Sequence, residues 1–271
     1  MKYDPIKKSL GVLFNKNTAL RQVFYKMLDV LLLRTWHVKR VVKHWAKENG
    51  DKKVNVLDAG SGFGQYSYFL SGVSKSWNIK GVDVKTEQID DCNSFFKKIK
   101  RENIKFEYAD LTNFVSDKKY DLIISVDVME HILEDQKVFE GFYSTMNTDG
   151  MLLISTPSDQ GGSDVHDHDH EGGSFIDEHV RDGYNIEGIQ QQLKKAGFTK
   201  TEASYTYGTP GKISWKLSMK YPILALNISK LFFVLLPFYY VVVMPFVLVL
   251  NYLDTKNSHK TGTGLLVKAW K

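Results

Sequence analysis

The spacing of hydrophobic and polar residues changes several times along this chain, and each spacing predicts a different element. Between residues 50 and 156, short apolar runs rich in β-branched residues alternate with longer amphipathic stretches. The runs predict strands near residues 53–58, 79–84, 104–110, 120–126 and 150–156, and the stretches predict helices near 64–72, 88–101 and 133–146. Such alternation is typical of a parallel sheet with helices on both faces, where ligands bind beyond the carboxyl ends of the strands.

The N-terminal pattern predicts two amphipathic helices, near residues 18–32 and 34–48, with Thr18 as the cap of the first. Residues 1–49 hold eleven Lys or Arg but only Asp4, Asp29 and Glu48 as acids. We interpret the segment either as a helical lid with a solvated basic face or as a surface that lies on anionic lipid. It shows no signal-peptide pattern. Nucleic acid is not an expected partner, because no stacking aromatics alternate with the basic residues.

The C-terminal pattern predicts two strands, 200–207 and 264–270, with an apolar insertion between them. Residues 231–250 carry no charge, and twenty such residues are enough to span a bilayer. A single span would place the last strand across the membrane, so the insertion has to enter and leave on one face. Pro237 and Pro245 each remove a backbone donor and disturb a helix, which favours a bent or broken hairpin. We therefore expect a monotopic helical hairpin or an in-plane helix, and a soluble cap that forms a dimer or covers the substrate remains the alternative.

Glycines follow the first predicted strand at a spacing that indicates a ligand loop. The strand ends at Asp58, glycines stand at positions 60, 62 and 64, and helix-forming residues resume at Gln65. Glycine allows close backbone approach or positive φ, and a helix start offers unpaired N–H groups. A dinucleotide fingerprint would need glycine at position 65. The carboxylate at the strand end instead favours a cofactor with a cationic amine, such as S-adenosylmethionine.

Residues 54–67 resemble the first motif of the class I S-adenosylmethionine-dependent methyltransferases, within the type 11-like group that acts on small molecules and lipids. Asp83 and Asp110 end the second and third strands, and the fourth strand leads into Asp127, in the order that this family shows. The resemblance implies a Rossmann-like, doubly wound sheet of seven mostly parallel strands. By this resemblance the cofactor-binding residues are Asp58, Gly60, Ser61, Gly62, Gly64, Asp83, Val84, Asp110, Leu111, Val126 and Asp127.

Three of these acids have expected roles. Asp58 would hold the methionine amine, and Asp83 lies at the distance expected of a ribose-binding carboxylate. In the resembled family the acid at Asp110 faces the adenine amine. Val126 or Asp127 would line the opening to the acceptor.

Two histidines are candidate catalytic residues. His179 stands in a run, residues 177–184, that resembles one after the fifth strand of small-molecule methyltransferases, and its pKa suits a base for a hydroxyl acceptor. Its alternative role is to orient the following helix, expected over 185–196. His131 has a second, weaker claim and is equally suited to capping or to lining the cofactor site.

Histidines alternate with acids at residues 166–171, inside a long loop over 158–183. Imidazole and carboxylate both bind divalent metals, but no zinc-like spacing is present. We expect a mobile polar loop over the active site rather than a metal site.

The composition indicates the size of the protein and the kind of compartment in which it works. The chain has 271 residues, 43 % of them apolar, a formal charge of +5 and one cysteine, Cys92, which fits a reducing compartment. We expect basic helices at 1–49, a methyltransferase domain at 50–207 and 263–271, and a membrane-associated insertion at 208–262.

The predicted function is methyl transfer, most favourably to oxygen, onto a hydrophobic, lipid-like or lipid-linked acceptor at the cytoplasmic face of a membrane. The alternatives are a soluble small-molecule methyltransferase and a non-catalytic, cofactor-binding membrane scaffold. The sequence leaves open the acceptor and the oligomeric state.

Overall fold

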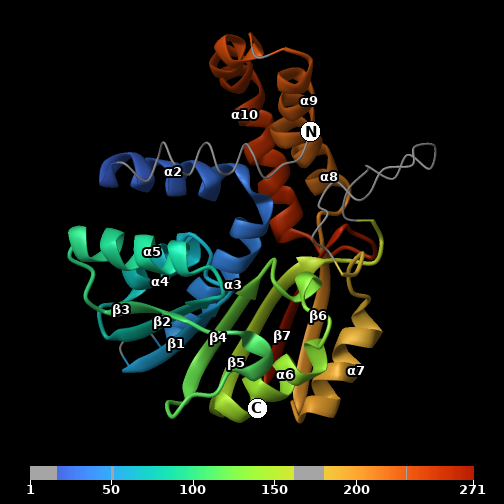
Figure 1. The fold of residues 1–271 in the computed structure, drawn as a ribbon. Coiled ribbons are helices and arrows are strands. Elements are labelled where there is room, and N and C mark those ends of the chain that lie inside the picture. The colour runs from blue at the N-terminus through green and yellow to red at the C-terminus, as the bar shows by residue number, and fades with distance from the viewer. Residues whose placement is uncertain (1–16, 50–51, 162–179, 230) are drawn as a thin grey trace.

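A seven-stranded sheet forms the centre of the computed structural model, which describes residues 17–49, 52–161, 180–229 and 231–271 (Figure 1). The strand order is β3-β2-β1-β4-β5-β7-β6. Strands β1 to β5 run parallel, and β7 pairs antiparallel with both β5 and β6. The strand bounds are Val54–Ala59 (β1), Trp77–Asp83 (β2), Ile104–Tyr108 (β3), Tyr120–Val126 (β4), Met146–Pro157 (β5), Lys200–Thr206 (β6) and Gly264–Trp270 (β7). The predicted doubly wound sheet is confirmed.

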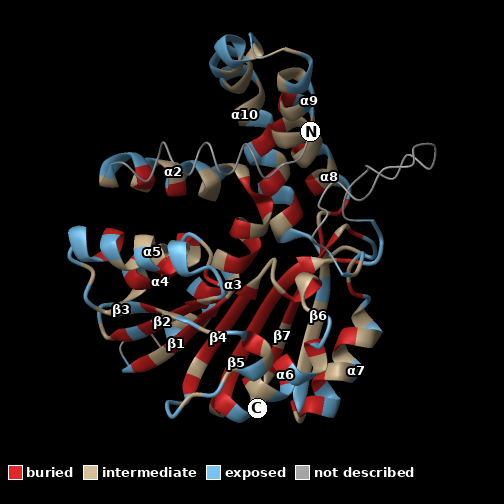
Figure 2. Cartoon of the chain, in the orientation of Figure 1, coloured by how far each residue is buried: buried red, intermediate tan, exposed pale blue. Residues whose placement is uncertain are grey.

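Alternate residues of the central strands face different helices, as a strand's period of two requires. In β1, Val56 packs in a cluster with α3 (Leu33–Asn49) and α4 (Gln65–Val73), whereas Leu57 packs with α6 (Asp135–Thr145) and α7 (Ile186–Ala196). A third cluster joins α5 (Thr86–Lys98) to Tyr25 of α2 (Thr18–Leu31). The strands are buried between these layers (Figure 2). Their near-continuous apolar runs follow from that burial on both faces.

Some element ends differ from those predicted. The cap of α2 is Asn17, whose side chain accepts from the Ala19 N–H at 2.8 Å, so the prediction of Thr18 was wrong. Asn and Thr are both good N-cap residues, so the sequence alone does not decide between Asn17 and Thr18. Asn17 is the cap because its backbone is extended and the helix begins at Thr18. Strand β5 begins at Met146 rather than near residue 150, because its pairing with β4 shifts register and the chain passes Asp149 in a left-handed conformation.

A helical hairpin, here called the arm (residues 209–256), rises beyond the carboxyl ends of the strands between β6 and β7 (Figure 1). It comprises α8 (Thr209–Trp215), the π-helical turn η3 (Lys216–Lys220), α9 (Tyr221–Ile228) and α10 (Phe232–Lys256). Pro237 and Pro245 both lie inside α10, so neither is the point at which the hairpin turns. The hairpin turns at Ser229 instead, where the backbone is extended and the hydroxyl accepts from the Leu231 N–H at 3.2 Å. A polar residue, Ser229, therefore ends the apolar helix α9.

Asp254 anchors the base of the arm. Its carboxylate is fully buried and accepts hydrogen bonds from His37 of α3 at 2.8 Å and from the Tyr207 and Gly211 N–H groups at 3.2 and 3.0 Å. His259 lies 3.2 Å from the other oxygen. Gly211 is required there, because a Cβ would stand 2.6 Å from the Asp254 carboxylate. One carboxylate thus joins α3, the end of β6, α8 and α10.

Replacing Asp254 by Ala is expected to destabilise the fold by about 3 kcal/mol at pH 7, since it removes the acceptor of several buried donors. Burial raises the pKa of Asp254, but the His37 hydrogen bond and the His37 and His259 charges outweigh it, and the net pKa is lowered. The contribution is therefore present above the unfolded pKa of about 3.9 and lost as the pH falls through the lower folded pKa. Thermal unfolding at pH 7 and at a pH well below about 3.9 measures it, and an unchanged melting temperature at pH 7 would contradict the anchoring role.

Candidate active site

The loop between β1 and α4 is shaped by its glycines. Gly60, Gly62 and Gly64 all have positive φ, at 79°, 52° and 81°. A Cβ on Gly60 would stand 2.3 Å from Cγ2 of Val128, so this position excludes a side chain by space as well as by conformation. The loop therefore lies close against the segment that follows β4.

Asp58 is a buried carboxylate at the end of β1. Only 2 % of the residue is exposed, and its one side-chain partner among the described residues is the Ser67 hydroxyl, which donates at 2.5 Å. Burial, helped by the nearby Asp83 charge, raises the pKa of Asp58 to about 7 although the Ser67 hydrogen bond opposes the rise. The Ser61 hydroxyl in the same loop is buried without a hydrogen-bond partner. A ligand with a cationic amine and further polar groups would satisfy both residues, which fits S-adenosylmethionine.

The other predicted acids occupy different positions on the same edge of the sheet. Asp83 ends β2 and accepts from the Gly62 and Lys85 N–H groups at 2.8 and 3.0 Å, so it ties the glycine loop to the second strand. Asp110 is exposed and caps the short helix η1 (Leu111–Asn113) by accepting from the N–H and hydroxyl of Thr112. Val84 is 54 % exposed, and Leu111 is buried.

Helix α2 lies over the glycine loop and holds it through Arg21 and Tyr25. The Arg21 guanidinium is buried and donates to the Phe63 carbonyl at 2.8 Å and to the Asp91 carboxylate at 2.5 Å. The Tyr25 hydroxyl donates to the same Phe63 carbonyl. Sequence reasoning missed Arg21, and its signal was an arginine four residues before an aromatic on a helix that packs on the sheet. These contacts make α2 a lid on the loop.

Asp127 follows β4 and stands beside the loop. It has a left-handed backbone with φ of 53°, and its carboxylate pairs with the Arg34 guanidinium of α3 at 2.5 Å. Val126, the last residue of β4, packs against the cluster under α3 and α4. The predicted edge residues therefore lie together, and Arg34 joins them from a distant segment.

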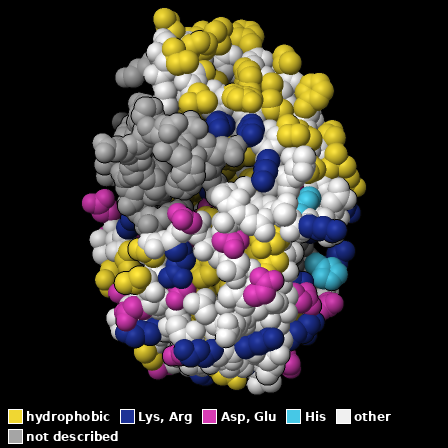
Figure 3. All heavy atoms as spheres, turned by 90° about the vertical axis from the view of Figure 1, so that its right-hand side faces the viewer, with side chains coloured by type: hydrophobic (Ala, Val, Ile, Leu, Met, Phe, Trp, Pro, Cys, Tyr) yellow, Lys and Arg dark blue, Asp and Glu magenta, His cyan; other side chains and the backbone are white. Residues whose placement is uncertain are grey.

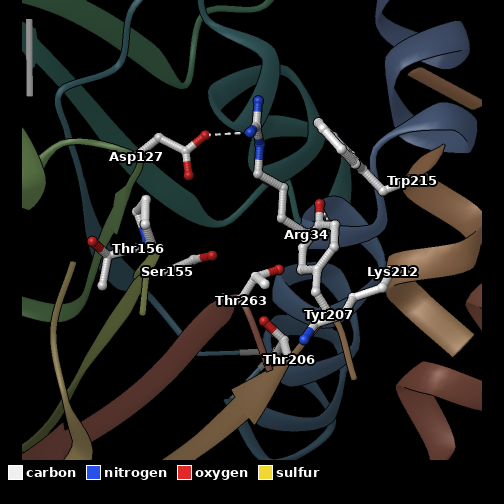
Figure 4. Close-up of a pocket in the computed structure, with 11 residues that line it drawn as sticks. Arg34, Asp127, Ser155, Thr156, Thr206, Tyr207, Lys212, Trp215 and Thr263 are labelled. Carbon is white, nitrogen blue, oxygen red and sulfur yellow. Dashed lines mark hydrogen bonds and ion pairs between the residues drawn. The ribbon is translucent and has the colours of Figure 1, made fainter. Parts of the chain in front are cut away.

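A pocket of about 130 Å³ opens next to Asp127, between the strand ends and the base of the arm (Figure 4). Strands β5, β6 and β7 supply its floor, and α3 and α8 supply its walls. Its lining residues are Arg34, Asp127, Ser155, Thr156, Pro157, Thr206, Tyr207, Lys212, Trp215, Thr263 and Gly264. Of these, only Asp127 was predicted as a site residue.

Tyr207 is held in this pocket under backbone strain. Its φ is 55°, which is rare for a bulky side chain, and the Asp254 carboxylate fixes its N–H. The phenol oxygen accepts from the Arg34 N–H at 3.0 Å, and burial raises the pKa of Tyr207 to about 12. Strained residues cluster at functional sites, and both Asp127 and Tyr207 line the pocket.

The two candidate histidines fare differently. His131 ends the short helix η2 (Met129–His131) and is half-buried, whereas α6 begins only at Asp135. His179 lies outside the described residues, as does the run 166–171. Within the described residues no group of three or more His, Cys, Asp or Glu is placed to hold a metal ion.

Glu130, next to His131, is a buried acid behind the pocket that sequence reasoning did not single out. It accepts from the Thr156 hydroxyl at 3.1 Å, and burial together with the Asp127 charge raises its pKa to about 8. Thr156 thus separates this acid from the pocket space.

A family model described as a methyltransferase domain matches residues 50–206, which is more than half of the chain. The chain belongs to the methyltransferase domain family. The sheet order and the glycine loop are those expected of its class I members, so the predictions of a methyltransferase with S-adenosylmethionine as cofactor are confirmed at the level of family and fold.

Proteins similar to this chain are named as N- or O-methyltransferases. It is 28 % identical over 149 residues to (S)-coclaurine N-methyltransferase of Papaver somniferum, covering 55 % of this chain and 39 % of that one. It is 26 % identical over 121 residues to a ubiquinone biosynthesis O-methyltransferase of Rickettsia akari, covering 44 % and 45 %. The chain thus spans less than half the length of these relatives.

The fold is also found in a solved structure of phosphoethanolamine N-methyltransferase 2 from Haemonchus contortus, bound to phosphomonomethylethanolamine and S-adenosylhomocysteine. The TM-score is 0.57 at 19 % identity, covering 83 % of this chain and 51 % of that one. At this identity the likeness concerns the fold alone.

Replacing Asp58 by Asn is expected to weaken S-adenosylhomocysteine binding about 10- to 100-fold, because a charge-assisted hydrogen bond becomes a neutral one. In the wild type, affinity should fall as the pH drops below about 7, where Asp58 takes up a proton. The variant should lose this dependence. Titration calorimetry across the pH range measures both effects.

The same substitution should stabilise the ligand-free protein in mild alkali. The folded pKa lies above the unfolded value, so the stability contributed by the neutral carboxyl is lost as the pH rises through about 7. A higher melting temperature at pH 8 is therefore expected for Asp58→Asn. Asp117→Asn, at an exposed carboxylate, is the control; equal behaviour of the two variants would rule out the role given to Asp58.

Proposed function

We propose that this chain is an S-adenosylmethionine-dependent methyltransferase that acts on a hydrophobic, lipid-like acceptor at a membrane surface. Family membership, the buried carboxylate of Asp58 and the glycine loop support the proposed binding of S-adenosylmethionine. The exposed apolar arm is the observation that supports the proposed position at a membrane.

The cofactor supplies a methyl group made electrophilic by its sulfonium. The chain's own residues would bind and orient the cofactor. Asp58 would take its amine, and Asp83 would take its ribose while it accepts a hydrogen bond from the Gly62 N–H. Asp110 would face the base, and Arg21 and Tyr25 hold the loop in place through the Phe63 carbonyl. Most of the rate enhancement then comes from proximity and orientation rather than from one essential acid or base.

The arm has the surface of a lipid-immersed element. Helix α10 has 25 residues and is the one helix of the described chain that is long and apolar enough to cross a membrane. Only 6 % of its most apolar 18-residue stretch is buried. A soluble core helix would be mostly buried. Large apolar side chains gather at the end of the molecule that the arm forms, with Lys and Arg side chains below them (Figure 3).

The topology supports a monotopic arrangement. Helix α10 leads back to β7, which pairs with β5 and β6, so both ends of the arm lie at the same edge of the sheet. The arm would dip into one leaflet while the sheet stays at the cytoplasmic surface. An apolar acceptor would then reach the pocket from the bilayer. Oxygen as the methyl acceptor, with His179 as its base, stays a prediction.

Acidic substitutions at the tip of the arm test the proposed position at a membrane. Phe238→Asp combined with Val241→Asp, at positions 70 % and 77 % exposed, is expected to abolish flotation with vesicles of phosphatidylethanolamine and phosphatidylglycerol. A charged side chain buried in the membrane core costs about 2.5–3.5 kcal/mol per residue. Val115→Asp, at a position 85 % exposed on the sheet domain, should float like the wild type.

The outcomes separate the alternative functions. No flotation of the wild type, together with a wild-type dimer that the Phe238→Asp, Val241→Asp variant converts to a monomer, would indicate a soluble enzyme with a dimer cap. Flotation without S-adenosylhomocysteine binding would indicate a membrane scaffold.

A further inference from the structure

We propose that the pocket beneath the arm is a subsite for an oxyanion, a carboxylate or phosphate, carried on the head of the acceptor. This inference rests on the proposed function and specifies its substrate class as an anionic amphiphile. It depends on the charge, the hydrogen-bonding groups and the position of the pocket.

Among the described residues that line the pocket, one cation has no acidic partner. Arg34 and Asp127 form an ion pair across one end, so their charges offset each other. Lys212 of α8 is the remaining charged residue of the lining, and its ammonium makes no hydrogen bond or ion pair with any other described side chain. In Figure 4 the Lys212 ammonium lies beside Thr206, at the opposite end of the pocket from Asp127. A half-buried cation without a counter-ion favours an anionic ligand.

The polar lining around Lys212 consists mostly of hydroxyls, each of which can donate one hydrogen bond. The hydroxyls of Ser155, Thr206 and Thr263 line the pocket and have no hydrogen-bond partner within the part of the chain that the structure describes. Ser155 and Thr206 are almost fully buried, at 6 % and 4 % exposure. An oxyanion accepts several hydrogen bonds and would satisfy these groups together with Lys212. A cationic head would find only the Asp127 carboxylate, which Arg34 already occupies.

The position of the pocket accounts for an amphiphile rather than a free anion. One end is Asp127, beside the glycine loop, and the other is Trp215 on the arm. A head group bound between them would lie next to the cofactor edge. Its apolar chain would leave past Trp215 toward exposed side chains of the arm such as Ile213. The pocket, at about 130 Å³, has room for a head group and not for a whole lipid chain.

Titration with short, monomeric probes tests this assignment on the full chain. Hexyl phosphate and heptanoate are compared with hexanol, hexyltrimethylammonium and inorganic phosphate, in the presence of S-adenosylhomocysteine. At least one anionic amphiphile is expected to bind about tenfold more tightly than hexanol or inorganic phosphate. Lys212→Gln should weaken that binding about tenfold or more, Lys212→Arg should restore it, and Lys260→Gln, at an exposed lysine outside the pocket, should leave it unchanged.

Three results would overturn the proposal: hexanol or the cationic probe binding as tightly as the anions, Lys212→Gln binding like the wild type, or inorganic phosphate alone matching the amphiphiles. Binding of S-adenosylhomocysteine by each variant shows that its fold is intact. If the wild type itself does not bind S-adenosylhomocysteine, the proposed methyltransferase function is refuted. Failure of the proposed subsite can therefore be told apart from failure of the proposed function.

Discussion

The pairing of β7 between β5 and β6 determines where the C-terminal third of the chain lies. Because β7 is the last strand and runs antiparallel to both neighbours, anything inserted before it has to return to the same edge of the sheet. The register brings Pro157, Gly264 and Thr206 into one row at this edge. That row is the floor of the pocket, and the arm rises directly above it. A strand pairing thus places the most apolar surface of the molecule over the polar pocket.

The cofactor side is built around groups that the protein alone leaves poorly satisfied. Asp58 is buried with one hydroxyl partner, and the Ser61 hydroxyl has none. The surrounding contacts, from Asp83 to Gly62 and from Arg21 to Phe63, hold the loop in shape nonetheless. A rigid loop around an unsatisfied carboxylate gives up stability in the free protein and gains affinity for a cationic ligand.

The features that sequence reasoning predicted well are those with a local signature. Strands buried on both faces have continuous apolar runs, and the glycine spacing after Asp58 reflects conformations that glycine adopts most easily, so the sheet, the loop and the edge acids could all be placed. The prolines did not locate the turn of the hairpin, because a helix can continue through them when the rest of its hydrogen-bond ladder is intact. The turn lies at Ser229. The pocket had no local signature, because Arg34, Tyr207 and Lys212 are brought together by tertiary packing alone.

Helix α3 contacts both the base of the arm and the pocket. It carries His37, which binds Asp254 at the base of α10, and one turn earlier Arg34, which binds Asp127. Both contacts are short and at least partly shielded from water, and α10 ends where the first is made. Any tilt of the arm against the sheet has to carry α3 along or separate His37 from a buried carboxylate. The angle of the arm against the sheet is therefore mechanically coupled to the opening beside the glycine loop.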